Sequence, residues 1–406
     1  MKTAGRYRSL GLSQMSIALD HPFALTHTES RAQTRDFAWH AYSVVAAAAM
    51  VLVGLIWDIS WHMSIGRDTF WTPAHLLIQA GGLTAGLGSG LLALHVTFRG
   101  TERQKASTVS FWGFRAPFGA WVCIWGCGAM LTSAPFDDWW HNAYGLDVRI
   151  VSPPHLVLGV GMLGILLGAL LRALALQNGR EDAMRARATT LFAIASGLVV
   201  TIVAIFCFEW SNVNAMHGGL FYRTLSIPMP FLLVTIAMAG RGRWAATTAA
   251  LVYMIALAGT SWILMLFPAT PKLGPIYQNI THYVPLNFPL LLVAPALAID
   301  LTLHRIRHWS TWRAAPLLGV VFLAAFVAAQ WPFAAALMRF GHSWFFHADN
   351  FVYWQSHASE RWMFTWQRAR PGDPALIVQL STALLFAAIS GAAGLGWGRW
   401  MTRVRR

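Results

Sequence analysis

The sequence predicts an all-α protein, a polytopic transmembrane helical bundle of about ten spans built from helical hairpins. Hydrophobic residues make up 56% of the 406 residues and charged residues only 11%, and the mean hydropathy is +0.49. Apolar windows of about 20 residues, long enough to cross a bilayer as a helix, recur along the whole chain. The lipid bilayer is therefore the first expected partner.

These windows, taken in order, predict spans at 39–57, 73–98, 114–135, 153–176, 188–209, 222–240, 243–267, 282–303, 314–338 and 375–398. Residues 1–38 are polar and basic and lack the apolar core of a cleaved signal peptide, so we expect a cytoplasmic tail. Residues 39–180 carry the motifs described below and are expected to form a metal-binding four-helix region. Residues 181–406 are expected to form a six-helix transmembrane region with a long outer loop at 339–372.

Basic residues predict the orientation of the spans. They concentrate in the terminal tails and in the loops that follow the second, fourth, sixth and eighth spans, as at Arg99, Arg103 and Lys105. The positive-inside rule then gives a multi-pass protein of a bacterial inner membrane with both termini cytoplasmic. The net charge of +14 is accordingly read as a topology signal, and no nucleic-acid partner is expected.

One motif occurs twice, each time between two apolar stretches. The copies are WDISWHMSIGRDTFWTPAHL and DDWWHNAYGLDVRIVSPPHL, and both contain Asp-x3-His-x3-Gly-x-Asp followed by a hydroxyl residue, a proline and a His-Leu pair. The candidate ligands are Asp58, His62 and His75 in the first copy and Asp137, His141 and His155 in the second. A single loop histidine is usually an interfacial side chain, but two copies of three groups at nearly the same spacing predict two related metal sites.

Local rules indicate how each copy brings its groups together. Asp58 and His62 are four residues apart and share a helix face. Thr72 is a candidate N-cap with Pro73 at the first helical position, which places His75 in the first turn of the next helix. The positive end of the helix dipole disfavours a charged imidazole there and keeps the ring neutral, as a metal ligand must be.

Four further residues complete the repeat. Gly66 and Gly145 are suited to turns. Asp68 and Asp147 are candidate cofactor-binding residues. Each can accept a hydrogen bond from the ring nitrogen of a ligand histidine that does not face the metal, or it can be a simple turn residue. Asp138 competes with Asp137 as a ligand, although only Asp137 keeps the four-residue offset.

The residue types alone leave the metal open, because two histidines and a carboxylate suit non-haem iron, zinc or copper. The segment WHM, GRDT and TPAH across residues 61–75 resembles the C subunit of the copper membrane monooxygenases, the particulate methane and ammonia monooxygenase family. In that subunit an Asp-x3-His, an Arg-Asp-Thr and a Thr-Pro-Ser-His supply an intramembrane copper site. The resemblance implies that Asp58, His62 and His75 hold the active copper ion and are the catalytic residues.

The second copy resembles the other metal site of that subunit, where an Asn-x3-His is followed by a proline-preceded histidine. It implies that Asp137, His141 and His155 hold a second ion, with Asp137 standing where the family has Asn. The resemblance covers roughly residues 39–180, and no match extends beyond about residue 181. The chain also contains no cupredoxin-like domain, so such a component would be a separate chain.

The resemblance implies a subunit or distant relative of a copper-dependent membrane monooxygenase. Such a protein would bind one or two copper ions and oxidise a small apolar substrate with O2, in company with other membrane monooxygenase subunits. The first alternative is a non-catalytic membrane copper carrier or reservoir using the same ligands. A haem or quinone electron carrier ranks last, because haem is usually held by histidines in the middle of helices and these lie at span ends.

Overall fold

The computed structural model describes residues 22–66, 71–145, 152–179, 182–211, 213, 215–340, 343–347, 352–353 and 374–404, with side chains from residue 38 in the first helix and from residue 186 in the sixth. The helices are α1 (Pro22–Ser64), α2 (Pro73–Arg99), α3 (Glu102–Ala106), α4 (Phe118–Tyr144), α5 (Pro153–Gln177), α6 (Asp182–Phe208), α7 (Gly219–Leu225), α8 (Pro228–Ala239), α9 (Ala245–Met254), the π-helical turn η1 (Ile255–Gly259), α10 (Thr260–Leu264), α11 (Val293–Ile306), α12 (Thr311–Arg339) and α14 (Leu376–Met401). The strands β1 (Val109–Phe111) and β2 (Phe114–Ala116) pair antiparallel.

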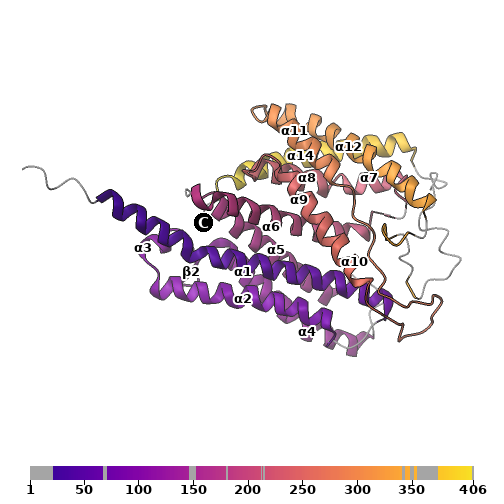
Figure 1. Cartoon of the computed structure of the whole chain (residues 1–406), viewed down its shortest axis with the longest axis horizontal. Coiled ribbons are helices and arrows are strands. Elements are labelled where there is room, and N and C mark those ends of the chain that lie inside the picture. Colours follow the sequence, from indigo (N-terminus) through magenta and orange to yellow (C-terminus); the bar gives the residue numbers. More distant parts are fainter. Residues whose placement is uncertain are drawn as a thin grey trace, which may run out of the picture.

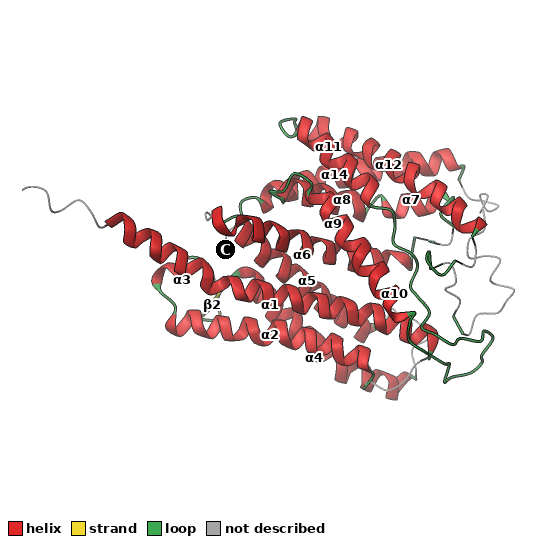
Figure 2. Ribbon diagram, in the orientation of Figure 1, coloured by secondary structure: helices red, strands yellow, loops and turns green. Residues whose placement is uncertain are grey.

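The prediction of an all-α, multi-pass bundle is confirmed. Within the described residues, eight helical segments are long and apolar enough to cross a membrane. They are α1 from Ala38, α2, α5, α6, α7 with α8, α9 through α10, α12 and α14. The ribbons of these helices run roughly parallel, and the longest loops gather at one end of the bundle (Figures 1 and 2).

The count of ten spans is not confirmed, and the two remaining windows differ for separate reasons. Helix α4 has 27 residues but is not among the eight apolar segments. The window at 282–303 is helical only from Val293. Pro285 and Pro289 lie in its first half, where each lacks a helical N–H donor and its ring clashes with the preceding turn.

The non-helical segment 282–292 is buried over most of its length, so its backbone groups need partners other than water. Side chains from neighbouring helices supply them: Ser60 Oγ donates to the Val284 carbonyl over 2.6 Å. The Leu290 N–H donates to the Tyr253 hydroxyl over 2.6 Å. Hydrogen bonds from helix side chains thus replace the helical ladder that the prolines prevent.

Close approach of backbones packs α1, α2, α4 and α5 together. A Cβ on Gly54 of α1 would lie 2.9 Å from the Ile78 nitrogen of α2 and 3.2 Å from the Ala74 carbonyl oxygen. Between α4 and α5, a Cβ on Gly126 would lie 2.8 Å from the Gly161 carbonyl oxygen. Small residues of this kind let membrane helices approach closely, and the two glycine contacts bring together the helix ends that carry the repeated motif.

Candidate metal centre

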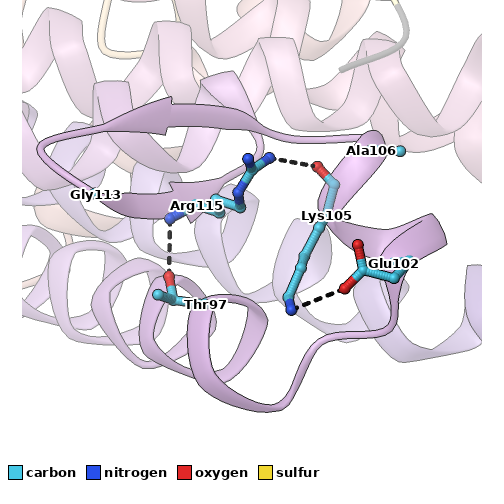
Figure 3. Close-up of a pocket in the computed structure, with 6 residues that line it drawn as sticks. All are labelled: Thr97, Glu102, Lys105, Ala106, Gly113 and Arg115. Atoms are coloured by element: carbon cyan, nitrogen blue, oxygen red, sulfur yellow. Dashed lines mark hydrogen bonds and ion pairs between the residues drawn. The ribbon is translucent and has the colours of Figure 1, made fainter.

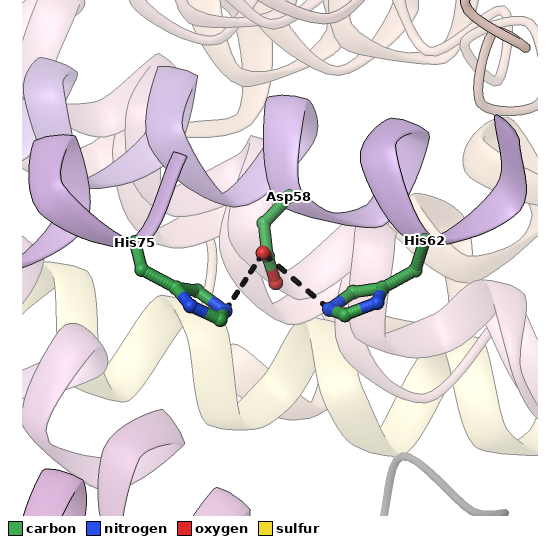
Figure 4. A group of neighbouring side chains, drawn as sticks. All are labelled: Asp58, His62 and His75. Carbon is green, nitrogen blue, oxygen red and sulfur yellow. Dashed lines mark ion pairs between the residues drawn. The ribbon is translucent and has the colours of Figure 1, made fainter. Parts of the chain in front are cut away.

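The first triad lies where α1 ends and α2 begins. Oδ1 of Asp58 is 2.9 Å from Nε2 of His75 and 3.5 Å from Nε2 of His62. Figure 4 shows the two imidazole rings on either side of the carboxylate, with their Nε2 atoms turned toward it. The predicted grouping of these three side chains is therefore present in the structure.

The turn between the helices fixes this arrangement. The backbone N–H of His75 donates to Thr72 Oγ1 over 3.3 Å, so Thr72 is the N-cap and Pro73 occupies the first turn, as the sequence predicts. Gly66 has a φ of +94°, a conformation that a side chain rarely adopts. A Cβ there would also lie 2.6 Å from the Tyr353 hydroxyl, so both backbone and packing require glycine.

The first triad meets the physical requirements of a metal site. Its three candidate ligand atoms lie within 4.8 Å of one another, and bonds of about 2.0–2.2 Å to one ion would place ligands roughly 3–4 Å apart. Oδ1 of Asp58 is buried, and the groups that face it are Nε2 of His75 and Nε2 of His62. A buried carboxylate is costly unless it is paired, and a cation between the three atoms would pair it.

The second triad is assembled in the same way but is looser. Oδ1 of Asp137 is 3.5 Å from Nε2 of His141 and 3.9 Å from Nε2 of His155. Neighbouring Asp138 is exposed, and its Oδ2 contacts the Asn142 amide at 3.4 Å instead. Asp137 is therefore the carboxylate that faces the two histidines.

The Ser152 hydroxyl makes two contacts within the second triad. Its hydroxyl caps α5 through the His155 N–H at 3.4 Å and also lies 2.7 Å from Nδ1 of the same ring. A partner at one imidazole nitrogen orients the other nitrogen toward a metal. The signal for this contact was the three-residue spacing of the Ser-Pro-Pro-His sequence.

The two triads lie in the same part of the bundle. His155 is close enough to Asp58 to interact with it electrostatically, alongside His62 and His75. Sequence reasoning treated the two motif copies as separate hairpins and had no means to place them together. Their proximity follows from the packing of α5 against α1.

Gln79 is a candidate site residue that motif analysis missed. It follows His75 by one turn of α2, and its Oε1 is buried with no hydrogen-bond partner among the described residues. Asp68 and Asp147, predicted to support the ligand histidines, lie outside the described residues.

Two histidines of the later outer loops have structural partners. His217 Nε2 contacts the Trp331 carbonyl at 3.1 Å, and burial lowers its pKa. His347 Nδ1 contacts the Leu286 carbonyl at 2.9 Å. Burial lowers the pKa of His347 to about 4, although this contact acts in the opposite direction. Both rings are therefore neutral near pH 7, and each contacts a backbone carbonyl group of the later part of the chain.

No family model matches the chain, and no curated protein or solved structure is significantly similar to it.

Proposed function

We propose that this chain is a copper-binding integral membrane protein and a subunit or relative of a copper-dependent membrane monooxygenase. It would oxidise a small apolar substrate with O2. The observation that carries the proposal is the convergence of His62 and His75 on the buried Oδ1 of Asp58 at the end of a spanning helix. The spacing of these residues resembles that of the family's copper site.

The donor set fits copper, although it would also accept iron or zinc. Two neutral imidazoles and one carboxylate neutralise part of the charge of a cation and leave coordination positions for small ligands. The side chains of Asp58, His62 and His75 keep 17%, 35% and 26% of their surface exposed. The centre is therefore partly exposed.

When bound, copper would supply the redox chemistry that activates O2. The protein's own residues would hold the ion and restrict water. Asp58 would bring the negative charge, and His62 and His75 would bind through Nε2. Trp57 and Trp61 are neighbours of Asp58 and His62 along α1 and pack against the hydrophobic core, so the candidate ligands adjoin an apolar part of the protein, which suits an apolar substrate.

A copper carrier or reservoir is the second candidate. The observation that favours it is that His155 of the second triad lies close enough to Asp58 of the first to influence it electrostatically. Two neighbouring ligand sets could pass an ion along without a reaction. The two functions separate cleanly, because catalysis requires O2-dependent product whereas transport gives metal flux without it.

The test is metal content and electron paramagnetic resonance of the purified protein, followed by assays of membranes. We expect His75→Ala to remove about one ion per chain and to abolish O2-dependent product. His282→Ala is the matched control, because that histidine is exposed in a loop. Unchanged copper stoichiometry in both His75→Ala and His62→Ala would overturn the site. Copper flux without product in the wild type would select the carrier.

A further inference from the structure

A pocket lies at the end of α2 opposite the candidate metal centre. It has a volume of about 500 Å³ and is lined by Thr97, Glu102, Lys105, Ala106, Gly113 and Arg115. Figure 3 shows it between the last turn of α2, the short helix α3 and the β1–β2 hairpin. Because α2 is a candidate span that ends at Arg99, the pocket lies at the edge of the membrane.

The pocket has a fixed frame and two cationic side chains. The Arg115 backbone N–H donates to Thr97 Oγ1 over 2.8 Å, which ties the hairpin to α2. Arg115 Nη1 donates to the Lys105 carbonyl over 3.3 Å, so within the described residues one hydrogen bond orients the guanidinium and leaves its other N–H groups for a ligand. A guanidinium held in this way suits the paired oxygens of a phosphate.

Lys105 is held only weakly. Its Nζ lies 3.1 Å from Glu102 Oε1, but the Glu102 side chain is 91% exposed. An exposed ion pair of this kind contributes little, so Lys105 can turn to an anion in the pocket. Between residues 97 and 118, Glu102 is the one acidic residue against four basic ones, Arg99, Arg103, Lys105 and Arg115.

An aromatic surface adjoins the pocket. Trp112 at the tip of the hairpin is 83% exposed and Phe98 at the end of α2 is 72% exposed. Phe111 packs on Trp125 of α4, with ring centroids 5.0 Å apart, so the hairpin lies along a spanning-length helix. Trp112 also has a φ of 49°, which is unfavourable for a bulky side chain. Aromatic side chains of this kind favour the boundary between headgroups and acyl chains.

We propose that this pocket binds the phosphate of an anionic phospholipid, with Lys105 and Arg115 as the cationic ligands. The aromatic surface formed by Phe98, Phe111 and Trp112 would lie against the upper acyl chains. A lipid explains both features together, because a free phosphate has no use for exposed aromatic rings beside the cations. The inference does not depend on the copper proposal, since the pocket lies roughly 35 Å from His75 along α2.

The test titrates the full-length detergent-solubilised protein with phosphatidylglycerol or phosphatidylcholine and counts bound lipids by native mass spectrometry. The wild type is expected to prefer phosphatidylglycerol. A basic residue near an anionic surface is worth about 1 kcal/mol, so Lys105→Ala and Arg115→Ala should each reduce the preference about fivefold. Trp112→Ala should weaken binding of both lipids without changing the preference.

Arg103→Ala is the matched control, because it removes the same charge from the same short helix and Arg103 does not line the pocket. An equal loss in Arg103→Ala would mean diffuse attraction and would overturn the site. Displacement of the lipid by inorganic phosphate at equal concentration would overturn the lipid assignment. The wild type provides a check independent of folding, since screening should weaken its preference when the salt concentration rises about tenfold but should not abolish it, because the cations in the pocket are partly buried.

Discussion

Gly54 sets the distance between the two helices that carry the first triad. It lies one turn before Asp58 on α1, opposite the first turns of α2. In Gly54→Ala the new Cβ would lie 2.9 Å from the Ile78 nitrogen, where ordinary contact begins at 3.4 Å. A backbone atom cannot move aside alone, so α2 must shift away by about 0.5 Å.

That shift is large on the scale of metal coordination. Productive geometry must be held within about 0.5 Å, and ligand distances within about 0.2 Å. The Ala74 carbonyl, which is also in the path of the new Cβ at 3.2 Å, belongs to the residue before His75. We expect Gly54→Ala to cost about 1–3 kcal/mol through overpacking and to weaken metal binding at the first triad about tenfold or more.

Competitive metal titration of purified variants measures the effect, with thermal unfolding in detergent as a parallel readout. Gly90→Ala is the neutral control, because a Cβ there meets no atom within 4 Å. Gly81→Ala gives a comparable overlap, 2.8 Å from the Ala47 carbonyl oxygen, but farther from the ligands. It should lower stability with a smaller loss of affinity. If Gly54→Ala binds metal like the wild type, the close approach of α1 and α2 does not position the triad.

Three further predictions follow from particular contacts. Asp137→Asn should weaken divalent metal binding at the second triad and leave the first intact; unaltered affinity in a metal titration would mean that this carboxylate is not a ligand. Ser152→Ala should lower metal affinity at the second triad about 10–100-fold, and Ser152→Thr should restore it if the hydroxyl orients His155. His347, with a pKa lowered to about 4, should contribute stability that is complete above pH 6.5 and is lost as the pH falls toward 4, about 3 kcal/mol in all. Thermal unfolding of His347→Gln should therefore show a flatter pH dependence in that range than the wild type, whereas substitution of the exposed His282 should leave the slope unchanged.

The first triad was predictable because its assembly is local. The four-residue spacing of Asp58 and His62 fixes a shared helix face, and the Thr72 cap with Pro73 fixes where α2 begins. Three ligands from two consecutive helices therefore follow from short-range rules. The packing of the second triad beside the first depends on contacts between α1 and α5, which no local rule encodes.

The later spans were less predictable for a physical reason. An apolar run reports that a segment is buried, but it does not report its backbone path. At 282–292 the composition is that of a span. Two prolines nevertheless interrupt the helix, and hydrogen bonds with Ser60 and Tyr253 satisfy the non-helical backbone. The β1–β2 hairpin was likewise hidden, because its residues adjoin the apolar run that begins α4.

Residues from the later part of the chain also form hydrogen bonds with the end of α1, the helix that carries Asp58 and His62. The last turn of α1 leaves carbonyl groups without helical partners, a costly state where water is excluded. The Lys272 N–H donates to the Ile65 carbonyl over 2.9 Å, and the Tyr353 N–H lies 3.4 Å from the Met63 carbonyl. Ser64 Oγ accepts the Val284 N–H over 2.7 Å. These contacts tie the end of α1 to the later part of the chain.

The end of α1 is therefore fixed by two sets of contacts. Gly54 brings α1 against α2, and residues of the later part of the chain hold the end of α1 through hydrogen bonds. Asp58 and His62 lie between these two points of attachment. A ligand set that must keep its geometry within a few tenths of an ångström needs such support. The motif thus supplies the candidate ligands, and residues of the later part of the chain hold the helix that presents Asp58 and His62.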